Sequence, residues 1–90
     1  MPQHKYIMDK AGFNKLRQVQ KLLLVMESGH LVMERKEPNR LQKLYVYQQF
    51  YVEVIYDIKR NKVLAIETPE MGKIVDDYLA TLSIDDLLNL

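Results

Sequence analysis

The stretch from Leu41 to Glu67 constrains the fold most, because it is rich in residues that favour strands and is broken only by short turns. Its first part, 41–57, is longer than an ordinary strand. We therefore expect a turn at Gln48-Gln49, although one long bent strand would also fit the pattern. A second turn is expected at 57–62, where Asp57 and Asn61 are typical turn residues.

Another short strand is expected before this stretch, at 30–36, and it should end at the turn 37–40, which contains Pro38-Asn39. The connections are too short for the helical crossovers that parallel strands need. The sequence therefore predicts a three- or four-stranded antiparallel meander. Within 41–57, even-numbered positions are mostly apolar and odd-numbered positions more polar, so we expect the odd-numbered tyrosines to share one partly solvated sheet face.

A helix is expected at 10–28, with Asp9 as its N-cap. Its apolar stripe follows the helical spacing i, i+3, i+4 and contains Leu16, Val19, Leu23 and Met26. Gly29 follows as a residue able to end the helix with a positive φ. We expect the stripe to face the sheet.

A second helix should begin at Thr68-Pro69-Glu70, with the Thr68 hydroxyl as its cap. Its expected core stripe consists of Met71, Ile74, Val75, Tyr78, Leu79 and Leu82. Residues 83–86 should cap a short terminal helical turn that carries Leu87, Leu88 and Leu90. These three leucines are expected to dock on a partner subunit or on the first helix.

These elements define an α+β fold: an N-terminal helix, the meander, and a C-terminal helix plus a short terminal helical turn. We expect one domain over 1–90, with 1–8 frayed and both helices on the same sheet face. The chain has 90 residues and no Cys, which excludes disulfides and thiolate sites. No signal peptide or membrane-spanning run is visible, so we expect a cytoplasmic protein that does not enter membranes.

No pattern of residues indicates a catalytic or metal centre. His30 with Glu27 and Glu34 has poor geometry for a metal site, and Ser28 and Ser83 belong to no Ser-His-Asp pattern. No glycine-rich phosphate loop is present. We therefore expect no cofactor and no metal, and an enzyme is unsupported.

The most suggestive group of residues is a possible binding face made by Arg40, Lys43, Tyr45, Tyr47 and Tyr51. Exposed aromatic residues interleaved with cations on a sheet can stack and neutralise single-stranded RNA. Tyr is also favoured in strands for cross-strand packing alone, and it is enriched at protein interfaces. The net charge of only +1 argues against nucleic acid.

The segments 50–57 and 62–67 (FYVEVIYD and KVLAIE) resemble the central hairpin of RelE-type mRNA-cleaving toxins. The resemblance covers less than a quarter of the chain. The first strand of that family is absent or reduced to Tyr6-Ile7-Met8, and the basic residues of its last strands have no counterpart here, where the segment is acidic.

The leading hypothesis is a small non-enzymatic binding or interaction module that self-associates as a homodimer, because a short sheet has exposed edges. The alternative is an RNA-binding or RNA-cleaving toxin-type protein. Clustering of the basic residues around the tyrosines would favour the alternative, and scattering would favour the interaction module.

Overall fold

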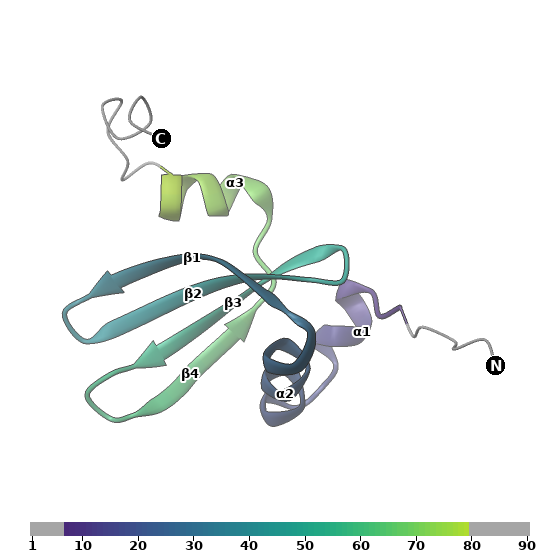
Figure 1. Ribbon diagram of the computed structural model, residues 1–90, viewed down its shortest axis with the longest axis horizontal. Coiled ribbons are helices and arrows are strands. Elements are labelled where there is room, and N and C mark those ends of the chain that lie inside the picture. The colour runs from purple at the N-terminus through teal and green to yellow at the C-terminus, as the bar shows by residue number, and fades with distance from the viewer. Residues whose placement is uncertain (1–6, 80–90) are drawn as a thin grey trace.

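The computed structural model of the chain describes residues 7–79 (Figure 1). A four-stranded sheet lies between two helices near the N-terminus and one helical segment near the C-terminus. In chain order the elements are α1 (Lys10–Asn14), α2 (Gln18–Ser28), β1 (His30–Glu37), β2 (Arg40–Tyr47), β3 (Phe50–Asp57), β4 (Lys62–Glu67), α3 (Met71–Ile74) and the π-helical turn η1 (Val75–Leu79). The α+β fold is therefore confirmed. Among these helices none is long and apolar enough to cross a membrane.

The strands form an antiparallel meander in the order β1-β2-β3-β4. The turn at Gln48-Gln49 exists, so 41–57 is a hairpin and not one bent strand. Gln48 takes a positive φ of 55°, and Asn61 takes one of 54° in the last hairpin. Asp57 accepts a hydrogen bond from the backbone N–H of Arg60, 3.1 Å away, as its position at the turn entry predicts.

The two-residue turn reverses the relation between residue number and sheet face. Tyr47 pairs with Phe50, so odd positions of β2 face the same side as even positions of β3. Tyr45 thus lies beside Val52, and Leu44 lies beside Glu53. The expectation that odd positions of 41–57 share one face is wrong, because it holds only for a strand without this turn.

The helices cover opposite faces of the sheet, so the expectation that both lie on one face is also wrong (Figure 1). On the α2 face of the sheet, Phe13 and Val25 pack on the side chains of β2, β3 and β4. On the α3 face, Ile74 and Tyr78 pack on Leu44. The residues of the α2-face core are Phe13, Val25, Tyr45, Tyr47, Phe50, Val52, Val54 and Ile66.

The predicted helix at 10–28 is broken at 15–17. Asp9 caps α1 as expected, with its carboxylate accepting from the Gly12 N–H at 2.7 Å. In one continuous helix Phe13 and Val25 would point about 120° apart. The break lets both side chains reach the same core, where each is fully buried.

Gly29 ends α2 for a different reason from the one expected. Its φ is −85°, which any residue can adopt. A Cβ at this position would lie 2.6 Å from the carbonyl oxygen of Val25. Close approach of the backbone, and not a positive φ, therefore favours glycine here.

The C-terminal helix starts at Met71, after Thr68-Pro69-Glu70 as predicted, but Thr68 does not cap it. The Thr68 hydroxyl accepts instead from the Asn14 side-chain amide at 2.9 Å, which ties α1 to the β4–α3 connection. Of the predicted stripe, Ile74 and Tyr78 are buried, whereas Met71, Val75 and Leu79 are exposed. The predicted Leu82 contact, the cap at 83–86 and the terminal turn with its three leucines lie outside the described residues.

Candidate functional site: an apolar ridge and groove at α2

The outward side of α2 carries three large apolar side chains. Val19, Leu23 and Met26 are 60%, 62% and 53% exposed. Their spacing of four and three residues places them in one row along the helix. We call this row the ridge. It belongs to the stripe that the sequence predicted to face the sheet, and that orientation is wrong.

The sequence fits two orientations of α2 because the five consecutive apolar residues at 22–26 cover every side of one helical turn. Val25 faces the core and Leu22 and Leu24 pack partly against it, which leaves the ridge on the other side. An apolar side of a helix normally packs against another part of the protein. In α2 only one side is covered by the rest of the described chain.

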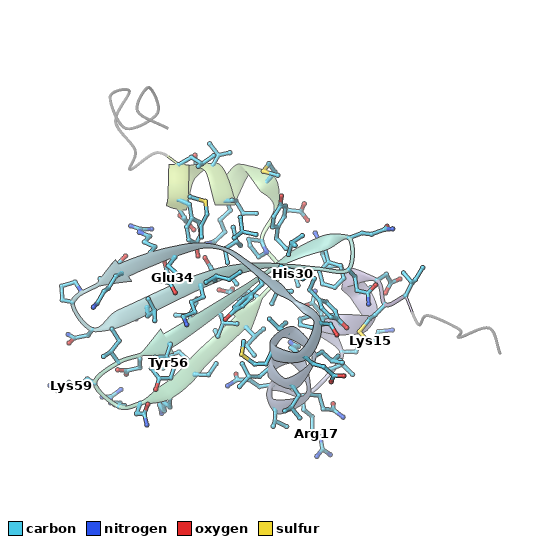
Figure 2. All side chains as sticks on the ribbon, in the orientation of Figure 1. Lys15, Arg17, His30, Glu34, Tyr56 and Lys59 are labelled. Carbon is cyan, nitrogen blue, oxygen red and sulfur yellow. The ribbon has the colours of Figure 1, made fainter. Side chains whose placement is uncertain are left out.

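A groove of about 260 Å³ runs between α2 and the uncovered part of the α2 face. Leu22 and Met26 form its wall, so the groove is continuous with the ridge. Its floor is formed mainly by side chains of β2 and β3, including Leu41, Tyr45, Val54 and Tyr56. Figure 2 shows Tyr56 on the part of the sheet that extends beyond α2.

On its other side the ridge meets a second, shallower apolar depression, lined by Met8, Leu16, Gln20, Leu23 and Leu24. Met8 lies at the end of the segment expected to be frayed, yet it packs partly buried on the core. The apolar surface therefore extends on both flanks of α2. Large contiguous apolar patches on a protein surface occur at protein interfaces, at membrane contacts and in ligand-binding grooves.

The five residues of the predicted binding face are not brought together. Lys43, Tyr45 and Tyr47 lie on the α2 face of the sheet, and Arg40 and Tyr51 lie on the α3 face. Tyr45 and Tyr47 are only 8% and 3% exposed. The expectation of a solvated tyrosine face is therefore wrong for these two residues, because α1 and α2 cover them. Of the five, Lys43 and Tyr45 line the groove.

The basic residues are scattered as well. Arg17 points away from the sheet at the base of α2 (Figure 2). Arg35, beside Gln42, lies on the α3 face and forms an ion pair with Glu37. Lys43 pairs with Glu34 at 3.7 Å. This scattering is the arrangement that favours the interaction module.

A second notable group of residues is the buried pair Glu53 and Tyr78, which the sequence patterns did not identify. Glu53 is fully buried under η1, and the Tyr78 hydroxyl donates a 2.8 Å hydrogen bond to its Oε2. Among residues 7–79, the other oxygen, Oε1, has no hydrogen-bond donor. Its nearest cation is the Lys73 ammonium at 3.9 Å, too far for a hydrogen bond.

Burial, followed by the hydrogen bond to Glu53, raises the pKa of Tyr78 well above its ordinary value. The hydrogen bond to Asp77 raises the pKa of Lys73, against a smaller opposing effect of desolvation. Tyr78 therefore stays a neutral donor and Lys73 a cation. This arrangement anchors η1 on the sheet; it places no nucleophile or general base in an open cavity.

The sequence offers one signal for this pair, a Glu in the middle of the apolar strand β3. Its odd position suggests exposure, and the helix on that face buries it instead. His30 is exposed in β1, and no three His, Asp or Glu residues within 7–79 could together hold a metal ion.

Comparisons of the chain with protein families, with curated proteins and with solved structures found no match in any of the three.

Proposed function

We propose that this protein is a small, non-enzymatic interaction module that binds another protein chain through the ridge and the groove of α2. The observation that carries the proposal is the exposure of Val19, Leu23 and Met26 beside an apolar groove. Burial of exposed apolar surface by a partner contributes about 25 cal/mol of favourable binding free energy for each Å² removed from water.

The surface also has the form that protein interfaces use. It combines a row of aliphatic side chains, Met26 among them, with the aromatic floor residues Tyr45 and Tyr56. Interface centres are enriched in Tyr and Met and depleted of charge. Because the ridge side chains contribute little to the core, replacing them should leave the fold intact.

The test compares Leu23→Lys with the matched control Met71→Lys. Both residues are exposed apolar helix positions, but Met71 lies on α3 across the sheet. Tagged proteins serve as bait in the cells that make the chain, and the bound chains, including its own untagged copies, are quantified. We expect Leu23→Lys to lose the partner and Met71→Lys to keep it. Equal capture by both variants, with unchanged circular dichroism, would refute the proposal.

A further inference from the structure

This inference rests on the proposed function and names the partner. We infer that the chain covering the ridge is a second copy of this protein, with the two α2 helices packed antiparallel about a two-fold axis near Leu23. The argument comes from the charges at the two ends of α2.

The charges of α2 are reversed relative to its helix dipole. Its N-terminal end carries Arg17 at the N-cap and Lys21 one turn later, and no acidic residue lies in the first turn. Its C-terminal end carries Glu27 and no basic residue in the last turn. Cations at the positive end and an anion at the negative end destabilise an isolated helix.

An antiparallel copy turns this disadvantage into an attraction. The N-terminal end of each α2 then lies beside the C-terminal end of the other, so Arg17 approaches Glu27 of the second copy and that helix's negative end. Two-fold symmetry forms the same contact twice. Within one copy the two residues are about 15 Å apart along the helix and cannot pair.

Both residues are available for such a contact. The ion pairs within residues 7–79 involve neither Arg17 nor Glu27. Arg17 points away from the sheet, at the base of α2 (Figure 2). The Arg17 side chain is exposed, and its backbone N–H donates a 3.0 Å hydrogen bond to the Gln20 side chain.

The ridge has the spacing that this pairing needs. With Leu23 near the axis, Val19 of one copy lies opposite Met26 of the other. Met26 is also the wall of the groove, so the Val19 side chain of the second copy packs at the edge of the groove. Two such helices cover each other's ridges in one isologous interface.

The decisive experiment is a charge exchange measured by sedimentation equilibrium at low salt. Arg17→Glu and Glu27→Arg should each weaken the dimer roughly 10-fold, because each replaces two attractions by two repulsions. The double variant restores the opposite charges and should return to within about 3-fold of the wild type. Lys59→Glu is the control, since Lys59 lies at the sheet tip away from α2 (Figure 2).

The same variants separate this proposal from a purely structural role. Arg17→Glu and Glu27→Arg both correct the mismatch with the helix dipole, so each should raise the melting temperature of the dilute monomer while weakening the dimer. A structural role would move stability and association in the same direction. Single variants that leave the dimer unchanged, or a double variant that does not recover, overturn the proposal.

Cysteine cross-linking tests the orientation, because the chain has no Cys of its own. Leu23→Cys should cross-link to itself under mild oxidation. Val19→Cys alone should not, but a mixture of Val19→Cys and Met26→Cys should. Self-cross-linking at all three positions indicates parallel helices and overturns the proposal.

The failure of this inference can be told apart from the failure of the proposed function. If the wild-type chain stays monomeric at high concentration, the inference that the partner is a second copy is overturned. If Leu23→Lys then loses a different chain that the wild type captures, the ridge is still supported as a binding surface. A dimer that Leu23→Lys does not weaken also overturns the second copy as the chain that covers the ridge, and equal capture of partner chains by Leu23→Lys and Met71→Lys overturns the proposed function.

Discussion

Removing the Tyr78 hydroxyl tests the buried anchor of η1 most sharply. In Tyr78→Phe, Glu53 Oε2 loses its 2.8 Å donor, and Oε1 has none to begin with. The carboxylate is fully buried, and the Lys73 ammonium lies 3.9 Å from its Oε1. A buried polar group left without its partner costs about 1–3 kcal/mol, and charged groups fall at the upper end.

We therefore expect Tyr78→Phe to lower the free energy of unfolding by about 2–3 kcal/mol. For a domain of this size that corresponds to a fall in melting temperature of roughly 8–24 °C. Thermal and urea unfolding followed by circular dichroism measure both quantities. Tyr51→Phe is the matched control, because Tyr51 is half-buried on the same sheet face and its hydroxyl makes no hydrogen bond within residues 7–79.

A double-mutant cycle shows whether the charge causes the loss. Glu53→Gln keeps an acceptor for Tyr78 but removes the buried charge, so Tyr78→Phe should cost about 1 kcal/mol less in that background. The account of the buried carboxylate is wrong if Tyr78→Phe is no worse than Tyr51→Phe, or if its cost is the same with and without Glu53→Gln.

Three further measurements test other parts of the structure. The pKa of Tyr78 is raised in the folded state, so the contribution of its hydroxyl to the free energy of unfolding is complete below pH 10. Above pH 10 that contribution falls by up to about 1.4 kcal/mol per pH unit. Urea unfolding at pH 9 to 11 should therefore show a shrinking stability difference between wild type and Tyr78→Phe. Ile74→Ala should cost about 2–5 kcal/mol and Leu79→Ala less than about 1 kcal/mol, because only Ile74 is buried; equal losses in thermal unfolding would contradict the orientation of α3. An RNA oligonucleotide should bind no tighter than about 10⁻⁴–10⁻⁶ M at physiological salt; a nanomolar complex in fluorescence anisotropy that vanishes in Tyr45→Ala would favour the RNA alternative.

Features that depend on neighbouring residues are predictable from the sequence. The Asp9 cap, the turn at 37–40, the turn at 57–62 and the strands between them follow from local chemistry. The short connections also suffice to predict the antiparallel meander, because they exclude crossovers.

Features that depend on tertiary packing are not predictable in the same way. Odd and even numbering alone assigns residues 41–57 to the two sheet faces as if they formed one strand. The turn at Gln48-Gln49 switches the face that odd positions occupy, so this numbering wrongly places Tyr45 and Tyr47 on a solvated face with Tyr51. It also predicts an exposed Glu53, because nothing local shows that η1 covers this residue. The orientation of α2 is ambiguous because two apolar stripes compete for the sheet.

The candidate site follows from that ambiguity. The sequence identifies Val19, Leu23 and Met26 as one apolar row but places it in the core. Only the arrangement in space shows that Val25 occupies the core and that the row remains outside. An apolar row that the fold does not bury is therefore the feature that the account must explain.

The most direct test of the α2 interface is the molecular mass of wild type and Leu23→Lys measured across a concentration series by sedimentation equilibrium. Leu23 is 62% exposed, so its burial in both copies of a dimer contributes roughly 2–4 kcal/mol, or about a 30- to 1,000-fold change in dissociation constant. The wild-type mass should rise from 10.7 kDa toward twice that value, and Leu23→Lys should remain at the monomer mass over the same range. Superimposable curves for the two proteins would contradict the dimer through α2.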